Sequence, residues 1–366
     1  MQTAKEKTII IFGGARDYHA MDWYRSVKKN SSNASVIFLT DQIAGEGFPD
    51  IREPGDNVKE LMIIDRFLFQ RQSRLADLWR NVFKIVILPI QVVLFRNYLS
   101  LHVSPVVHCQ PLYYALICLL AGQDYIVTPQ GSDVLIRPAR SRIYKRIAKT
   151  ILERASAVTV DSVQLQRVIQ DISGVKAFLV QDGIDTKEIL RQARPNHSRT
   201  KLVSIRGLTA IYRIKLIDDA LRRENIGIPC EYVYPFADAE YLRELKKQAR
   251  VEDEFVGRLP KKELYDALAR ALLVISIPSS DSSPRSVYEA IFAGSAVAVT
   301  SNDYVDQLPL CMRAGVCVVD ITSDTWLTDA FNFAREATRV PFSPSEDAVD
   351  MFDENIVKVR LLEQVY

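Results

Sequence analysis

Short apolar runs rich in β-branched residues alternate along the chain with longer amphipathic segments. An apolar run of about four to eight residues is typical of a buried strand, whereas apolar positions three and four residues apart indicate a helix. Their alternation predicts parallel sheets covered by helices, the α/β class. The predicted strands are residues 8–12, 34–40, 61–64, 105–109, 124–128, 157–160 and 177–180 in the first half, and residues 201–205, 231–235, 254–256, 272–277, 296–300 and 316–319 in the second.

The amphipathic segments predict the helices that connect these strands. The clearest are residues 22–29, 70–97 with a break at Pro89, 113–120, 141–153, 162–172 and 350–366. A chain of 366 residues suits two domains of about 180 residues better than one.

The polar stretch 193–200 separates the two sets of strands. We therefore expect a first domain over residues 1–190, a second domain over residues 200–345 and a helical segment over residues 346–366.

Composition favours a cytoplasmic protein. The five cysteines contain no Cys-x-x-Cys pair, and their odd number argues against a disulfide framework. The N-terminal residues pass from a polar lead into a strand without a signal-peptide pattern. The longest apolar stretch, residues 82–95, contains Lys84 and Pro89 and is shorter than the roughly 20 residues that span a bilayer. We therefore expect no integral membrane segment.

The net charge of +2 conceals a basic region in the first half. Residues 66–154 hold 13 Lys and Arg against 4 Asp and Glu, and the densest part is residues 137–149. This segment is either a solvated helix face or a surface that docks on anionic lipid, and the sequence leaves both interpretations open. Nucleic acid is disfavoured, because no aromatic-interleaved basic motif accompanies the charge.

The strongest chemical signal follows the predicted strand 272–277. A Ser- and Pro-rich loop leads from this strand into a short helix near Ser286, and Gly294 precedes the next strand. Such a helix N-terminus presents backbone N–H groups and a favourable dipole to a diphosphate. Asp281 lies on the loop, and Glu289 lies on the helix within reach of a ribose diol. In open α/β sheets, ligands bind at this carboxyl edge of the strands.

These residues resemble a motif of the retaining GT-B glycosyltransferases, in particular glycosyltransferase family 4. Asp281 and Glu289 match the family's two acidic residues separated by seven positions, and the segment Ala290-x-x-x-Gly294-x-x-Val297 is similar to the sequence that follows them. The resemblance implies two Rossmann-like parallel-sheet domains that face each other across a cleft. It also implies that Glu289 binds the ribose of the donor and that Asp281 contacts its sugar. The first acid is Asp rather than Glu, and Pro284 stands where Gly is common, which bears on the sugar preference.

Further segments resemble the same family in the same order. Residues 254–260, with Gly257 and Leu259, are similar to the strand and loop that cradle the base. Residues 158–162 and 183–185 resemble two further family segments, and residues 352–366 resemble the terminal helix that crosses back to the first domain.

By the same resemblance, a set of residues around the acidic motif and after the first strand is expected to contact the donor. These residues are Arg285, Ser286 and Val287 at the helix start, and Gly13 and Gly14 in the first loop. A simple strand-ending turn explains the two glycines equally well.

Stabilisation of a diphosphate leaving group requires cations. Arg206 matches the arginine that ends a strand in the family, and the cation that follows is either Arg213 or Lys215, with Arg213 preferred. Gln130 stands where many relatives carry His, and its catalytic role is left open.

Candidates for the acceptor side come from loops of the first half. Asp133 belongs to a glycine-containing loop that resembles the floor of the family's cleft. His19 and His108 lie near other predicted loops at the same edge, although a lone histidine is more often structural.

The resemblance implies transfer of a sugar from a nucleotide-diphosphate sugar, with UDP or GDP as the expected base carrier, to a glycan or lipid-linked acceptor with retention of configuration. No His-x-x-His or Asp-x-Asp motif occurs, so we expect neither a metal nor another cofactor. Two alternatives remain at this stage. One is a nucleotide-sugar 2-epimerase of the same fold, and the other is a non-catalytic nucleotide-sugar binding protein.

Overall fold

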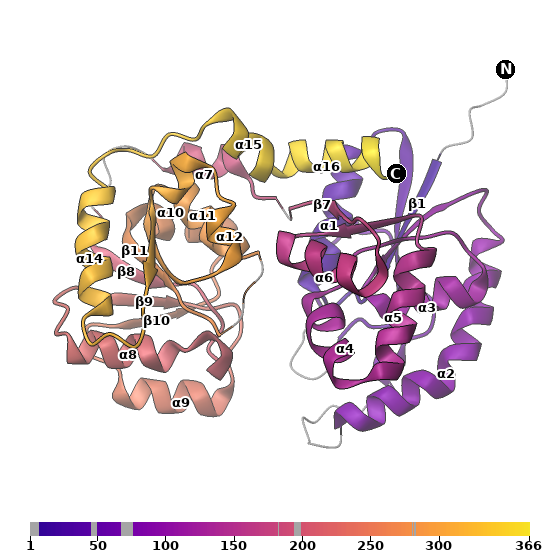
Figure 1. Ribbon diagram of the computed structural model, residues 1–366, viewed down its shortest axis with the longest axis horizontal. Coiled ribbons are helices and arrows are strands. Elements are labelled where there is room, and N and C mark those ends of the chain that lie inside the picture. Colours follow the sequence, from indigo (N-terminus) through magenta and orange to yellow (C-terminus); the bar gives the residue numbers. More distant parts are fainter. Residues whose placement is uncertain are drawn as a thin grey trace. The chain divides into compact units, whose positions relative to one another are not determined.

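The computed structural model describes residues 7–44, 50–66, 76–181, 183–193, 199–279, 281 and 283–366. They form two compact units (Figure 1), one of residues 1–182 with 357–366 and one of residues 183–356. The boundary lies just before Gly183, eight residues earlier than predicted, because helix α7 (Thr186–Gln192) packs on the helices α10 (Lys261–Arg270) and α11 (Arg285–Phe292) of the second unit. Most of the predicted linker, residues 194–198, falls outside the described residues.

The first unit contains a parallel sheet of seven strands in the order β3-β2-β1-β4-β5-β6-β7. The chain winds outward in one direction from β1 and in the other from β4, so the order reverses between these neighbours. The strands are β1 (Lys7–Gly13), β2 (Ala34–Thr40), β3 (Val58–Glu60), β4 (Val106–Gln110), β5 (Ile126–Val127), β6 (Ala157–Val160) and β7 (Phe178–Leu179).

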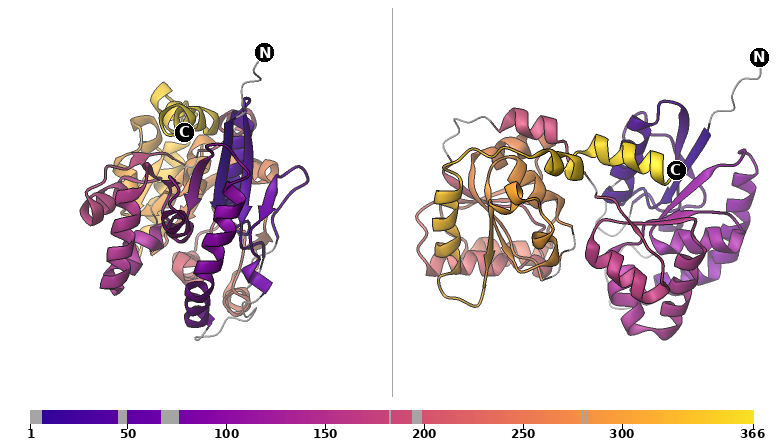
Figure 2. Two further views of the ribbon diagram at one scale, coloured as in Figure 1. Left: turned by 90° about the vertical axis from the view of Figure 1, so that its right-hand side faces the viewer. Right: turned by 45° about the horizontal axis from the view of Figure 1, so that its top comes forward.

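Helices cover both faces of this sheet (Figure 2). One face packs against α1 and α16, and the other against α2, α3, α5 and α6. The helices are α1 (Tyr18–Asn30), η1 (Ile64–Arg66), α2 (Ala76–Leu99), α3 (Leu112–Ala121), η2 (Ser132–Ile136), α4 (Arg137–Arg140), α5 (Arg142–Arg154), α6 (Val163–Ser173) and, at the C-terminus, α16 (Glu354–Gln364).

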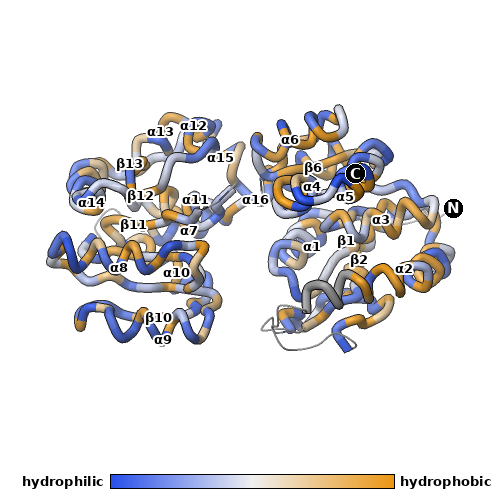
Figure 3. Tube along the Cα trace, turned by 60° about the horizontal axis from the view of Figure 1, so that its bottom comes forward, coloured by the Kyte–Doolittle hydropathy of each residue, from blue (hydrophilic) through white to orange (hydrophobic). Residues whose placement is uncertain are grey.

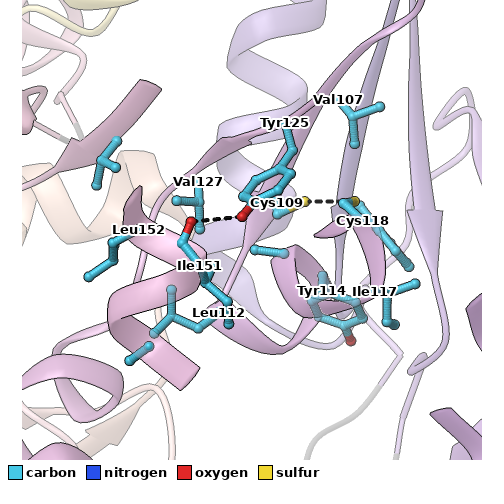
Figure 4. Packing of buried hydrophobic residues seen from close by; sticks show 14 of the residues in the cluster. Val107, Cys109, Leu112, Tyr114, Ile117, Cys118, Tyr125, Val127, Ile151 and Leu152 are labelled. Atoms are coloured by element: carbon cyan, nitrogen blue, oxygen red, sulfur yellow. Dashed lines mark hydrogen bonds between the residues drawn. The ribbon is translucent and has the colours of Figure 1, made fainter. Parts of the chain in front are cut away.

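Figure 4 shows the interior beneath α3 and α5. Apolar side chains of β4, β5 and both helices interdigitate there, and the Tyr125 hydroxyl donates a hydrogen bond to the Ile151 carbonyl at 2.7 Å. The Cys109 and Cys118 sulfurs lie 3.3 Å apart in the same cluster. The alternating pattern of the sequence is thus satisfied by strands that are buried on both faces.

The second unit repeats this architecture with six parallel strands in the order β10-β9-β8-β11-β12-β13. Its strands are β8 (Lys201–Ser204), β9 (Cys230–Val233), β10 (Glu254–Gly257), β11 (Ala271–Ser276), β12 (Ala296–Thr300) and β13 (Val316–Val319). Its remaining helices are η3 (Ala210–Tyr212), α8 (Ile214–Arg223), α9 (Ala239–Gln248), α10 (Lys261–Arg270), α11 (Arg285–Phe292), α12 (Asp303–Asp306), α13 (Leu310–Arg313), α14 (Trp326–Ala337) and α15 (Glu346–Phe352). The prediction of two Rossmann-like parallel-sheet domains is confirmed.

Three predicted elements differ from the structure. Residues 61–64 do not form a strand, because the residues that pair with β2 are the preceding Val58–Glu60. Helix α2 continues through Pro89. Pro89 lies on the exposed side of the helix. A carbonyl on that side of a helix can bond to water when a proline removes its N–H partner. The predicted helix 350–366 is interrupted at Asp353, whose side chain caps α16 by accepting from the backbone N–H groups of Asn355 and Ile356.

Helix α2 is longer and more apolar than the stretch seen in the sequence. Its segment Val82–Leu99 has a mean hydropathy of 1.6, and by length and composition alone it is sufficient to cross a membrane. Only 22% of that segment is buried within the protein. The coloured part of α2 in Figure 3 is largely hydrophobic.

Candidate functional site

The strand order reverses once in each sheet, between β1 and β4 in the first and between β8 and β11 in the second. The loops that follow these four strands lie at the carboxyl edges of the sheets. In the second unit, the loops after β8 and β11 are neighbours, because these two strands pair directly. In the first unit, the loops after β1 and β4 are neighbours for the same reason. Crevices at such reversals are the usual ligand sites of open α/β sheets. Most of the residues predicted to carry chemistry follow these strands.

Arg206 and Asp281 form an ion pair in the second unit. Arg206 lies two residues after the end of β8, and its Nε donates to the Ser276 Oγ at the end of β11 at 2.8 Å. The Arg206 guanidinium also lies 5.8 Å from the ring centroid of Tyr212. The Arg206 and Asp281 side chains remain 13% and 17% exposed, so both are partly accessible to solvent. The structure thus joins two residues that lie 75 positions apart in the sequence.

The backbone of the Asp281 loop is held at several points. The Asn302 Nδ2 donates to the Asp281 carbonyl at 2.8 Å, and the Ser279 N–H donates to the Ile211 carbonyl at 2.8 Å. Burial, together with the negative charge of Asp281, raises the pKa of the nearby Tyr304. These hydrogen bonds hold the backbone at Ser279 and Asp281, and the Arg206 ion pair holds the carboxylate.

Glu289 lies on α11, and its carboxylate is buried between two other side chains. The Tyr265 hydroxyl on α10 lies 3.5 Å from Glu289 Oε1, and the Arg285 Nε lies at the same distance of 3.5 Å. Burial and the Glu289 charge raise the pKa of Tyr265, so Tyr265 remains a neutral hydrogen-bond donor. The helix therefore holds an oriented carboxylate one turn beyond its N-terminus.

The other predicted donor contacts of this unit occupy distinct positions. Arg285 and Ser286 begin α11, where backbone N–H groups have no acceptor within the helix. Val287 is fully buried in the core, which leaves only its backbone for a ligand. Gly257 ends β10 with φ +83°, a conformation that favours glycine, and Leu259 is partly buried against the core cluster of this unit.

The two alternative cations after Arg206 differ in their surroundings. Lys215 forms an ion pair with Glu244 on α9, and its ammonium lies 5.2 Å from the Tyr241 ring. Arg213 precedes α8 with φ +55°, a left-handed conformation that is uncommon for a residue with a side chain. Within the described part of the chain, Arg213 forms no ion pair. Strained backbone of this kind occurs often at functional sites.

In the first unit, the loop after β1 contacts the loop after β5. Asp17 caps α1 by accepting from the His19 N–H at 3.0 Å, and its second oxygen accepts from the exposed Gln130 side chain at 2.5 Å. His19 is exposed beside them. Asp17 was not predicted from the sequence, although an Asp just before a helix that follows Gly-Gly is a recognisable signal.

The two glycines that precede this loop have different roles. A Cβ at Gly13 would lie 2.9 Å from the Gln110 carbonyl of the neighbouring strand, so packing alone requires glycine there. A Cβ at Gly14 would make ordinary contacts at 3.4 Å or more, so packing does not explain this second glycine.

His108 and Asp133 lie in the interior of the first unit. The two His108 ring nitrogens bond the Tyr366 hydroxyl and, at 2.6 Å, the Thr128 Oγ1. Burial and the Lys358 ammonium lower the pKa of His108 to about 3, so its ring is neutral at physiological pH. Both His108 and Asp133 are at most 1% exposed, which leaves little surface for an acceptor to contact.

A buried polar network that the sequence did not reveal lies beside these loops. Asp41 follows β2 and accepts hydrogen bonds from the Tyr114 hydroxyl and, at 2.9 Å, from the Gln91 Nε2 of α2. The Asp41 side chain is completely buried, and burial raises its pKa even though Lys84 opposes the shift. The network connects α2 to the carboxyl edge of the sheet.

The variant Asp41→Asn is expected to gain stability relative to the wild type as the pH rises from about 4 to 7. An unfolded Asp has a pKa near 3.9, and the folded pKa of Asp41 is higher. Protonation of Asp41 therefore stabilises the folded wild type. This contribution is complete below the unfolded pKa and is lost as the pH rises through the folded pKa. Asparagine does not titrate. Melting temperatures of variant and wild type across this range measure the difference, and exposed Asp324→Asn is the control. If the difference in melting temperature between Asp41→Asn and the wild type did not change with pH, the raised pKa of Asp41 would be contradicted.

No family model matches the sequence, and no curated protein matches it. Solved structures do match over almost the whole chain. Anabaena HepE in complex with UDP and glucose aligns with a TM-score of 0.69 and 14% identity, covering 98% of this chain and 99% of HepE. Sucrose-phosphate synthase from Thermosynechococcus elongatus aligns with a TM-score of 0.71 and 13% identity, covering 98% of each chain.

A glycosyltransferase from Rickettsia africae aligns with a TM-score of 0.66 and 11% identity, covering 98% of this chain and 97% of the other. At these identities the similarity establishes the fold alone. The chain has the GT-B fold, with two Rossmann-like parallel-sheet domains.

Proposed function

We propose that the protein is a glycosyltransferase that uses a nucleotide-diphosphate sugar as donor. The observation that carries the proposal is the arrangement of Arg206, Asp281 and Glu289 at the carboxyl edge of β8 and β11, in a chain with the fold of HepE. HepE was solved with UDP and with UDP-glucose, which favours UDP as the nucleotide.

In this proposal the second unit binds the donor. Glu289 accepts hydrogen bonds from the ribose hydroxyls, since Tyr265 and Arg285 already orient its carboxylate. Arg206 and Arg213, rather than the ion-paired Lys215, neutralise the diphosphate, assisted by the first N–H groups of α11. Asp281 contacts the sugar and, through its ion pair, holds Arg206 in position before the donor arrives.

The proposed reaction proceeds with retention of configuration and without a metal ion. The bond between the anomeric carbon and the diphosphate oxygen breaks, and the acceptor hydroxyl oxygen forms a bond to the same face of that carbon. The acceptor proton passes to an oxygen of the departing diphosphate, while the arginines stabilise its negative charge. A glycan or lipid-linked acceptor would be bound by the first unit beside Asp17, His19 and Gln130, and we propose the cytoplasm as the compartment.

The variant Glu289→Ala is expected to bind UDP about 10- to 100-fold more weakly than the wild type. Loss of a hydrogen-bonded charged group costs about 1.5–3 kcal/mol, which corresponds to this factor. Thermal-shift titrations with UDP, GDP, ADP and CMP measure the affinity, because a ligand of the native state raises the melting temperature. The matched control is Glu336→Ala, which removes an exposed carboxylate that pairs with Arg339 on the surface of the same unit.

Unchanged UDP affinity in Glu289→Ala, or no shift with any nucleotide, would contradict the proposal. If UDP binds, analysis of the reaction products separates the alternatives. A donor sugar whose C2 is inverted after incubation without acceptor would indicate an epimerase. Binding of the donor without turnover, with or without acceptor, would indicate a binding protein.

A further inference from the structure

The outward side of helix α2 is apolar over more than three turns. Most of its exposed residues lie three or four positions from one another, and one pair is adjacent, which places them in one stripe. They are Val82, Ile85, Val86, Ile90 and Val93, between 42% and 70% exposed. A surface helix of a globular protein normally turns its polar side outward. A continuous exposed apolar patch of this kind marks a site of interaction.

The opposite side of α2 holds the helix firmly against its own unit. Phe95 stacks on Phe12 of β1 with ring centroids 5.0 Å apart, and Gln91 donates to the buried Asp41. Arg96 donates to two carbonyls at the end of α3 at 2.9 and 3.1 Å. Because these contacts hold the helix along the unit, the apolar stripe is suited to lie on a surface rather than to cross a membrane.

Helix α5 adds positive charge to the same layer. Helix α3 lies between α2 and α5 and contacts both, and the buried sides of all three pack into one cluster (Figure 1). The residues 137–149 include six Lys and Arg and no Asp or Glu. The exposed residues of α5 include Arg142, Lys145, Arg146 and Lys149, together with Ile143 at 73% and Ile147 at 40% exposed. Cations thus alternate with exposed apolar side chains.

We propose that this helical layer docks on an anionic lipid bilayer. The apolar stripe of α2 and the isoleucines of α5 would enter the boundary between headgroups and acyl chains, while the α5 cations contact the headgroups. The charge of residues 137–149 had left a solvated helix face as the alternative interpretation, but a solvated face does not explain the apolar stripe beside it.

Two other occupants fit this layer less well. A second copy of the chain would bring one basic helix against another, and a nucleic acid would offer no apolar partner to α2. Docking on a membrane does not depend on the proposed transferase activity.

Co-sedimentation of the full chain with vesicles tests the proposal. The wild type is expected to bind vesicles of phosphatidylcholine mixed with phosphatidylglycerol, to lose affinity as salt is added, and to bind vesicles of phosphatidylcholine alone much more weakly. The double variants Ile85→Ser/Ile90→Ser and Lys145→Ala/Arg146→Ala are each expected to lose about tenfold or more in affinity for the anionic vesicles.

Two matched double variants of the second unit are the controls. Val251→Ser/Val340→Ser removes apolar side chains that are even more exposed, and Arg243→Ala/Lys247→Ala removes exposed cations of α9. Both should retain wild-type affinity. If Ile85→Ser/Ile90→Ser lowers the melting temperature, Val86→Ser/Val93→Ser takes its place on the same stripe.

Three outcomes would overturn the proposal. The first is the absence of binding to any vesicle, and the second is equal binding to neutral and anionic vesicles. The third is a wild-type dimer in lipid-free sedimentation velocity that Ile85→Ser/Ile90→Ser dissociates, which would assign the stripe to self-association. UDP binding by the same variants is expected to stay unchanged, so a failure here is distinguishable from a failure of the proposed function.

Discussion

Replacement of Arg206 by alanine is expected to lower kcat for sugar transfer by about 10²- to 10³-fold. One preorganised donor that faces developing negative charge is worth about 2.7–4 kcal/mol of transition-state stabilisation. Arg206 is preorganised by its bond to Ser276 at 2.8 Å and by its ion pair with Asp281. Its loss also leaves the Asp281 carboxylate without this cation, next to a diphosphate that carries the same sign of charge.

Steady-state kinetics with the donor identified by the binding screen measure this effect. A lysine at position 206 keeps the charge but loses the planar fork of donors, so Arg206→Lys should fall between the wild type and Arg206→Ala. Arg335→Ala on the exposed side of α14 is the control and should keep the wild-type rate. A kcat within about threefold of the wild type in Arg206→Ala would remove Arg206 from the proposed reaction, because it would then supply less than 1 kcal/mol.

The variant Asp133→Ala is expected to lower the free energy of unfolding by about 2–4 kcal/mol. Asp133 is 1% exposed, and its carboxylate accepts from the backbone N–H of Leu112 at 3.1 Å and from that of Gln130 at 3.3 Å. Its other oxygen, Oδ1, lies 3.0 Å from the Arg137 Nη1 and accepts a hydrogen bond from the Tyr144 hydroxyl at 3.3 Å. Alanine leaves buried donors without an acceptor, and each such group costs about 1–3 kcal/mol.

Calorimetric unfolding measures the loss, with Asp133→Asn as the isosteric control. Asparagine retains one acceptor oxygen and the shape of the side chain, so most of the stability should remain. UDP affinity should be unchanged in both variants, because the proposed donor residues belong to the other unit. A loss below about 1 kcal/mol in Asp133→Ala would show that water replaces the carboxylate at this position.

The sequence alone was sufficient to predict the class of fold and most strands of both sheets. Strands buried on both faces must be apolar over their whole length, so β1, β2, β11 and β12 stand out without any knowledge of their neighbours. The positions of Asp281 and Glu289 after β11 were also readable, because strand, loop and helix follow one another directly in the chain. Strand β3 was misplaced, since a strand of three residues with the pattern VKE carries no hydrophobic period.

Only the tertiary structure decided which distant side chains meet. Ser276 and Asp281 reach Arg206 because β8 and β11 are neighbours in the sheet, although about 70 residues separate them in the chain. Tyr265 reaches Glu289 because helix α10 packs on helix α11.

The tertiary structure also decided which side chains are buried and which are exposed. The sequence places Asp133 on a predicted loop and His108 near the loop that ends a predicted strand, whereas packing encloses both in the interior. It presents α2 as an apolar segment, and only the fold shows that its apolar stripe faces outward. Local pattern determines secondary structure, because the period of a helix or strand is a local property. Contacts and exposure depend on strand order and helix packing, which bring together residues that are far apart in the chain.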